Sequence, residues 1–133
     1  MTERPGRINV FVDGTAQPPV VFAPADVVAE GEGGMLGLEV DPQFEANGYV
    51  FVCMASSAGG ATDVRVVRFT LSDEGDAILD RSDIVTGMPY RTGRHSGCRP
   101  RFGNDGFLWV GTGDAAIAST PQDNGSLGGK VLR

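Results

Sequence analysis

The sequence predicts an all-β fold, and three observations lead to that class. The chain has 133 residues, of which 20 are glycine and 8 are proline. So many helix-disfavouring residues argue against a helical bundle, because each costs about 1 to 3 kcal/mol inside a helix. The apolar runs are short and β-rich, and Asn-Gly and Asp-Gly pairs separate them. Runs of this kind are typical of hairpins and meanders.

Five apolar segments are predicted to be strands, and each is bounded by turn residues. They are 8–12, ending at Asp13-Gly14; 35–40, ending at Asp41-Pro42; 49–54, following Asn47-Gly48; 64–71, closing at Asp73-Glu74-Gly75; and 107–110, following Asn104-Asp105-Gly106. No helix longer than one turn is expected. Single turns are possible at 24–29 and at 115–119, the latter stopped by Pro121, and segments 56–62 and 118–129 are expected to be loops.

Two stretches are similar to one another, which suggests a repeat. Residues 38–52 and 101–110 each contain a strand, a turn, a glycine followed by an aromatic residue, and a second strand. The steps Gly48-Tyr49 and Gly106-Phe107 lie 58 residues apart, which suits a β-propeller blade of about 40 to 50 residues with an insertion. The chain would then hold two to three blades. Because each blade is buried only by its neighbours, this number predicts that further blades complete the ring.

Composition and charge narrow the possible partners. The net charge is −6, which argues against nucleic acids and anionic membranes, since both are bound by lysine and arginine. No run reaches the roughly 18 apolar residues of a membrane span, and the first residues have no hydrophobic signal core. The two cysteines, Cys53 and Cys98, are expected to be buried thiols, with one disulfide as the alternative.

The single histidine, His95, is the candidate general base. It lies in a polar segment, where a histidine is more often solvated or structural, but its ordinary pKa suits proton transfer near neutral pH. A base also needs an acceptor that fixes its tautomer. Asp114, 19 residues downstream, could supply one if the strand before it runs beside His95. The alternative is that Asp114 is only a turn residue.

Two glycine-rich segments are further candidates for a site. In 30–37, four glycines surround Glu32, which would let the backbone approach a ligand or another strand closely, although a plain glycine-rich turn is the simpler interpretation. Residues 111–116 match the pattern G-x-G-x-x-A of nucleotide-binding proteins. No helix of useful length follows, so nucleotide binding is not expected there.

Taken together, the motifs resemble the glucose/sorbosone dehydrogenase family, the soluble glucose and aldose sugar dehydrogenases that use pyrroloquinoline quinone (PQQ). The resemblance is collinear over nearly the whole chain. It includes 2–8, Gly31-Glu32-Gly33-Gly34-Met35-Leu36-Gly37-Leu38, Asp41-Pro42-Gln43-Phe44, Asn47-Gly48-Tyr49-Val50 and 65–69. Its most specific part runs from His95-Ser96-Gly97-Cys98-Arg99 through 101–106 and Gly111-Thr112-Gly113-Asp114 to 122–133.

The resemblance implies a partial six-bladed β-propeller, with two to three blades of four-stranded antiparallel sheets. Residues 1–30 would end the first blade, 31–90 would form the second and 91–133 would start the third. It implies PQQ and calcium as cofactors, with most of their ligands outside this chain. It also implies a sugar substrate, an external electron acceptor and a periplasmic or secreted location.

The resemblance also assigns roles to individual residues. His95 would take the proton of the sugar C1 hydroxyl while hydride passes to the PQQ C5 carbonyl, and Asp114 would orient His95. Glu32 would lie beside the cofactor, together with Arg94, which replaces an aspartate of some members. No residue of the chain is expected to bind a metal ion.

Departures from the family pattern keep other functions open. Cys98 replaces a family glycine, and Pro100 replaces a strand aliphatic. The expected activity is PQQ-dependent oxidation of aldoses to lactones, with weak or no activity of this chain alone and possible self-association through unpaired blade faces. A non-catalytic propeller that serves binding is the alternative, and a self-contained small β domain is a third possibility.

Overall fold

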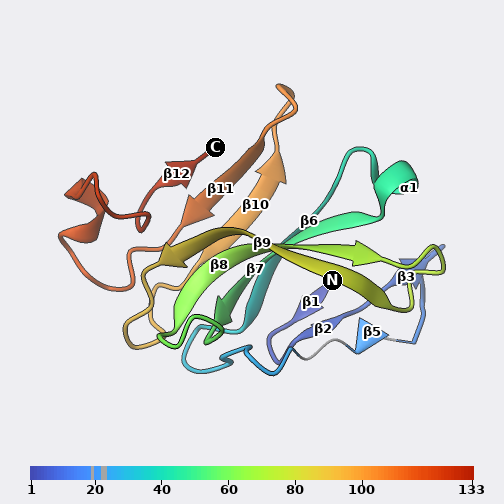
Figure 1. Cartoon of the computed structure of the whole chain (residues 1–133), viewed down its shortest axis with the longest axis horizontal. Helices are drawn as coiled ribbons and strands as arrows, with labels where there is room; N and C mark the ends of the chain where they lie inside the picture. The colour runs from blue at the N-terminus through green and yellow to red at the C-terminus, as the bar shows by residue number, and fades with distance from the viewer. Residues whose placement is uncertain (19, 22–23) are drawn as a thin grey trace.

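The computed structural model describes residues 1–18, 20–21 and 24–133, and nearly all of its regular structure is antiparallel sheet (Figure 1). The strands are β1 (Thr2–Glu3), β2 (Arg7–Ile8), β3 (Phe11–Val12), β4 (Thr15–Ala16), β5 (Val20–Val21), β6 (Met35–Val40), β7 (Tyr49–Ser56), β8 (Asp63–Leu71), β9 (Ile78–Met88), β10 (Cys98–Phe102), β11 (Leu108–Thr112) and β12 (Val131–Leu132). Two short helices complete the elements of these described ranges, α1 (Phe44–Asn47) and the 3₁₀ turn η1 (Thr120–Gln122). The all-β prediction is confirmed.

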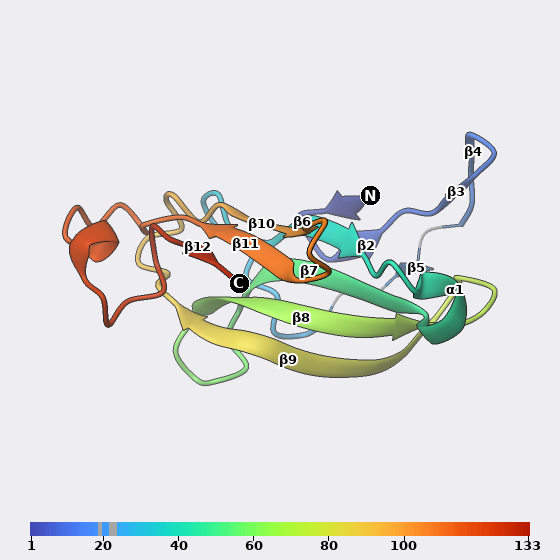
Figure 2. The ribbon, with the colours of Figure 1, turned by 90° about the horizontal axis from the view of Figure 1, so that it is seen from above.

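The described strands form three main sheets that follow one another along the chain. Their strand orders are β1-β2-β5, β6-β7-β8-β9 and β10-β11-β12, and β3 and β4 make a separate hairpin. The third sheet lies over one face of the central sheet (Figure 2). Strand β6 contacts β1 on one side and β10 on the other, so it is the strand at which the three sheets meet.

The predicted strands differ from the observed ones where tertiary contacts determine the strand pairing. Segment 35–40 coincides with β6, and 49–54, 64–71 and 107–110 overlap β7, β8 and β11. The prediction that residues 8–12 form one strand was wrong, because Ile8 pairs with β5 whereas Phe11 pairs with Ala16 in the small hairpin. Strand β9 was missed, because it is a polar edge strand whose pairing with β8 shifts register several times.

The helical elements also differ from the expectation. Helix α1 fills the connection between β6 and β7, where no helix was predicted. The turn expected at 115–119 before Pro121 is displaced into η1, and Pro121 lies within its first turn. Proline is compatible with that position because the first residues of a helix need no N–H bond.

The core consists of two apolar clusters on opposite faces of the central sheet. One includes Ile8, Met35, Val52 and Phe69 and fills the space toward the first sheet. The other includes Phe51, Val66 and Val110 and fills the space toward the third sheet. Successive residues of β7 and β8 therefore point alternately into the two clusters, as the period of a strand requires.

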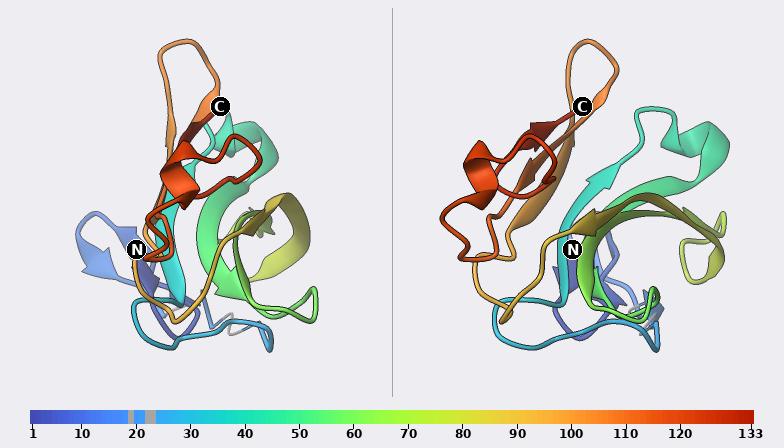
Figure 3. Two further views of the ribbon diagram at one scale, coloured as in Figure 1. Left: turned by 90° about the vertical axis from the view of Figure 1, so that its left-hand side faces the viewer. Right: turned by 60° about the vertical axis from the view of Figure 1, so that its left-hand side comes forward.

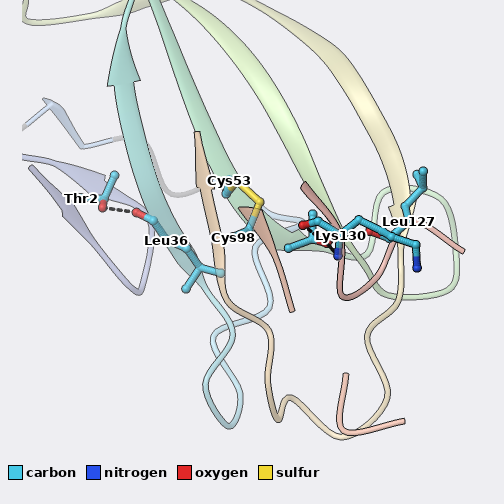
Figure 4. Close-up of a disulfide and its surroundings, with 7 residues drawn as sticks. Thr2, Leu36, Cys53, Cys98, Leu127 and Lys130 are labelled. Carbon is cyan, nitrogen blue, oxygen red and sulfur yellow. Dashed lines mark hydrogen bonds between the residues drawn. A yellow bond between two sulfur atoms is a disulfide. The ribbon is translucent and has the colours of Figure 1, made fainter. Parts of the chain in front are cut away.

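The two cysteines form a disulfide, so the prediction of two free thiols was wrong. Cys53 of β7 and Cys98 of β10 are both buried, and their Cα atoms lie 5.7 Å apart, a separation typical of disulfides. The bond joins the central and third sheets (Figure 4). Because 45 residues separate the two positions, only the packing of β10 against β7 shows that they meet.

A polar network lies along the outer strands of the central sheet. Arg81 of β9 makes a bidentate ion pair with Asp26, with hydrogen bonds of 2.8 and 3.0 Å, and Asp26 also accepts a hydrogen bond from the Ser56 hydroxyl. Arg65 of β8 bonds to Asp83. The hydrogen bonds from Arg81 are the main reason that the pKa of Asp26 is held below its ordinary value, against the opposing effect of burial.

Candidate active site

His95 lies in the loop that joins β9 to β10, at the end of the sheets where several connections gather. The loop 89–97 and the glycine-rich loop 29–34 both reach this end (Figure 3). The backbone of His95 has φ of 50°, an uncommon value for a residue with a Cβ. Its side chain is 52% exposed, so the ring is accessible from solvent.

Asp114 lies directly against the ring of His95. Its Oδ1 is 2.8 Å from His95 Nδ1 and accepts a second bond from the backbone N–H of Ala116. The bond with His95 is the largest cause that holds the pKa of Asp114 below its ordinary value. A charged carboxylate at Nδ1 favours the tautomer that carries its proton there, which leaves the lone pair of Nε2 free.

Gly113 explains why Asp114 comes so close. The backbone N–H of Gly113 donates to the carbonyl of Gly97 at 2.6 Å, and its own carbonyl accepts from Gly129. A Cβ at position 113 would overlap the carbonyl oxygen of His95. Only glycine therefore lets the end of β11 lie against the His95 loop, which is the arrangement that the expected pairing required.

Glu32 also reaches this site, but its carboxylate points to the backbone of His95. Oε2 of Glu32 accepts the His95 backbone N–H at 2.6 Å. In the opposite direction, the Glu32 N–H donates to the carbonyl of Gly93 at 2.6 Å. The glycine-rich segment around Glu32 is thus more than a plain turn, because its backbone packs against a second loop.

Arg94 is exposed next to His95, and within the described part of the chain it forms no ion pair or hydrogen bond. The structure thus brings together His95, Asp114 and Glu32 through direct bonds and adds Arg94 only as a neighbour in sequence. Across the described ranges, no group of three or more His, Cys, Asp or Glu side chains is placed to hold a metal ion.

Three residues around the site were not found by sequence reasoning. Arg4 donates to backbone carbonyls of the Glu32 loop, and the Tyr90 hydroxyl donates to the carbonyl of Glu30 at 3.0 Å. Lys130 donates to the carbonyls of Thr120, Pro121 and Gly128 and so fixes the loop after Asp114. Their signal in the sequence is weak, because all of them bind backbone atoms that any residue type presents.

An unsatisfied polar atom lies beside the candidate base. Ser96 is 2% exposed, and its Oγ has no hydrogen-bond partner among the described residues. It borders a small hollow shared with His95, Met88 and Thr112. This hollow is too small to hold a water molecule, so the Ser96 hydroxyl is enclosed by the protein itself.

The fold and the site together define a class. Antiparallel sheets that are each formed by a consecutive stretch of the chain and pack face to face are the arrangement of β-propeller blades, and the His95–Asp114 pair lies on loops at one end of them. In the described residues, no helix has the length and apolar character needed to cross a membrane.

Comparison with known proteins assigns the family. The sequence profile of the Glucose / Sorbosone dehydrogenase family matches residues 1–133, and the chain belongs to this family. The aldose sugar dehydrogenase YliI of Escherichia coli is 27% identical over 135 residues, which cover 100% of this chain and 36% of that protein.

Solved structures agree with this assignment. A putative oxidoreductase (glucose dehydrogenase) of Thermus thermophilus is 39% identical with a TM-score of 0.86, and the match covers 99% of this chain and 38% of that protein. The PQQ-bound aldose sugar dehydrogenase of Streptomyces coelicolor is 29% identical with a TM-score of 0.87, over 99% of this chain and 39% of that protein. The chain thus corresponds to little more than a third of these proteins, and its fold is part of a β-propeller.

Proposed function

We propose that this chain contributes the general base to a PQQ-dependent oxidation of aldose sugars to lactones. The observation that carries the proposal is the His95–Asp114 pair, with Nδ1 bonded to a carboxylate and the ring half exposed. A PQQ-bound relative of the same family supports the cofactor. The full activity belongs to a longer assembly of blades, of which this chain supplies about a third.

In this role Nε2 of His95 accepts the proton of the sugar C1 hydroxyl. Asp114 keeps the proton of the neutral ring on Nδ1, and it stabilises the positive charge that the ring acquires when Nε2 is protonated. Because the pKa of Asp114 is lowered, its carboxylate stays charged at the pH where His95 acts. The pair needs no further titratable group for this step.

The residues near His95 fit PQQ in part. PQQ is an ortho-quinone with three carboxylates, and when bound it supplies the acceptor for the hydride removed from the sugar carbon. Arg94 is an exposed cation beside His95, without a partner among the described residues, and suits a carboxylate. Glu32, whose carboxylate is bonded to the backbone N–H of His95, adds a polar group beside the same loop. The calcium implied by the resemblance would take its ligands from other blades.

We also propose that the sheets divide as blades, with 1–30 at the end of the first, 31–90 as the second and 91–133 as the start of the third. The third sheet supports self-association of the isolated chain, because Trp109 and Val131 are exposed there at 38% and 72%. A location outside the cytoplasm is supported by the disulfide, which persists in oxidising compartments.

A chimera tests the function. Residues 1–133 would replace the corresponding part of the Thermus thermophilus relative, and dye reduction by glucose would be measured with added PQQ and calcium. We expect activity that falls by about 100-fold or more in His95→Ala, as removal of a general base requires. Arg94→Ala should weaken PQQ binding while retaining turnover at saturation. A folded chimera that binds PQQ and oxidises sugar equally well without His95 would refute the role of His95 as base. A folded chimera that oxidises no sugar would instead favour a non-catalytic binding propeller.

The isolated chain provides the complementary measurement. We expect weak PQQ binding, no sugar oxidation, and association in sedimentation experiments. Saturable PQQ binding with calcium and dye reduction that depends on His95 would show instead that these blades suffice. A clean monomer with a sharp cooperative melt would contradict the expected association and favour a self-contained small β domain.

A further inference from the structure

Arg4 is the residue that fixes the glycine-rich loop. From the turn between β1 and β2, its guanidinium donates to the carbonyls of Ala29, Gly31 and Gly33 at 3.3, 2.6 and 2.9 Å. The backbone carbonyl of Arg4 accepts from the N–H of Met35 at 2.9 Å. One side chain therefore holds three carbonyls within five residues, a task that suits the several donors of the arginine fork.

The loop fixed by Arg4 lies against the His95 loop at backbone distance. A Cβ on Gly31 would lie 2.8 Å from the carbonyl oxygen of Gly93, and a Cβ on Gly93 would lie 2.8 Å from that of Glu30. Both glycines also have positive φ, 54° and 68°. The two loops are therefore shaped to meet each other, and movement of one displaces the other.

Glu32 transmits this contact to His95. Its carboxylate accepts the His95 N–H at 2.6 Å, a short bond of the strong charge-assisted kind. His95 has φ of 50°, which costs free energy for a residue with a Cβ and persists only where its surroundings hold it. Among the described residues the ring itself bonds only to Asp114, so the bond to Glu32 fixes the backbone of His95 and leaves the ring free to react.

We propose that Arg4 and Glu32 are positioning residues for His95. Glu32 accepts a hydrogen bond from the backbone N–H of His95, and Arg4 holds the loop that carries Glu32. As a result, Nδ1 of His95 stays against Asp114 and Nε2 of His95 stays directed outward. Both act on the backbone and not on the ring. The significance of this arrangement rests on the proposed role of His95 as base, but the arrangement can be measured without any sugar or cofactor.

The single histidine makes the measurement direct. In ¹⁵N-histidine-labelled chain, the ring and amide signals come from His95 alone. We expect Glu32→Ala and Arg4→Ala to accelerate exchange of the His95 amide hydrogen by about tenfold or more, as loss of a bond to a charged group predicts. The ring signals should shift from the Nδ1-protonated tautomer toward a mixture. Glu32→Gln keeps an acceptor and should retain most of the wild-type behaviour.

Two matched controls separate positioning from general loosening. Arg7→Ala removes an exposed arginine of the same sheet whose ion pair, among the described residues, is with half-buried Glu3 at 3.4 Å. Glu30→Ala removes an acidic side chain of the same loop whose carboxylate accepts no hydrogen bond from a described residue. Both should leave the His95 signals unchanged. If the chain associates, amide hydrogen exchange of peptide 91–97, measured by mass spectrometry, gives the same comparison between the variants and the controls.

The outcomes are distinct. Unchanged exchange and tautomer in Glu32→Ala would overturn the proposal. If Arg4→Ala lowers the stability of the whole chain, Glu32→Ala still tests the positioning role of Glu32. The role of Arg4 is then tested with Arg4→Lys, which keeps the charge but not the planar guanidinium. Faster exchange of the His95 amide in Arg4→Lys would support that role, and unchanged exchange would refute it. Altered His95 signals in these variants, together with a chimera that needs no His95 for sugar oxidation, would support the positioning roles of Arg4 and Glu32 and refute the proposed role of His95 as base.

Discussion

The sheets and the loops at their end are held by different interactions. In the central sheet, apolar side chains such as Phe69 and Val52 are completely buried between neighbouring sheets. In the loops around His95, the contacts are hydrogen bonds to backbone atoms and close approaches between glycines. The stability of the fold and the geometry of the site therefore depend on separate residues, so that variants can change one without the other.

The largest effect should come from the core. Phe69→Ala removes a completely buried ring from the cluster between the first and central sheets, and we expect it to lower the free energy of unfolding by about 3 to 5 kcal/mol. Urea denaturation followed by circular dichroism would measure the change. A loss below about 1 kcal/mol would show that the sheets do not depend on this cluster.

Reduction of the disulfide should have the next largest effect on stability, because this bond joins the third sheet to the central sheet. Reduction of Cys53–Cys98 is expected to lower the free energy of unfolding by about 2 to 4 kcal/mol. Denaturation with and without a reducing agent would measure it, and the double variant Cys53→Ala/Cys98→Ala should not respond to the reducing agent. Equal stability of oxidised and reduced wild-type chain would mean that apolar packing alone holds this interface.

A smaller and pH-dependent effect is expected from Asp26. Because Arg81 lowers its pKa below the unfolded value of 3.8, the charged carboxylate stabilises the fold above that pH, and the contribution is lost as the pH falls through the folded pKa. Asp26→Asn should lower stability by about 1 kcal/mol at neutral pH. The difference from wild type should shrink in acid. Asp73→Asn, in an exposed turn, is the control, and a difference independent of pH would contradict the assignment.

The smallest effect on stability should come from the base itself. His95→Asn keeps a residue that tolerates positive φ, and since the ring is half exposed the free energy of unfolding should change by no more than about 0.5 kcal/mol. Thermal and urea unfolding would measure it beside Phe69→Ala. A large loss of stability would mean that the site and the fold are not separable.

Sequence reasoning predicted the regular parts of the fold well. The apolar runs and the turn residues around β6, β7 and β8 located these strands, because β7 and β8 bury side chains on both faces and so give nearly continuous apolar runs. It did not find β9, whose polar residues pack on an edge, nor α1. For the site, His95 and Asp114 were named as a pair and Glu32 as a residue beside the cofactor, and the structure brings all three together.

The all-β class, the turn positions, the family and the residues able to do proton chemistry can be predicted from the amino-acid sequence, because they follow from local composition and ordered motifs. Three contacts are visible only in the folded chain: Cys53 meets Cys98, Gly113 lets Asp114 reach His95, and Arg4 fixes the loop of Glu32. Each of these contacts joins segments far apart in the chain, often through backbone atoms, and backbone atoms are the same in every residue type, so the sequence does not indicate their partners.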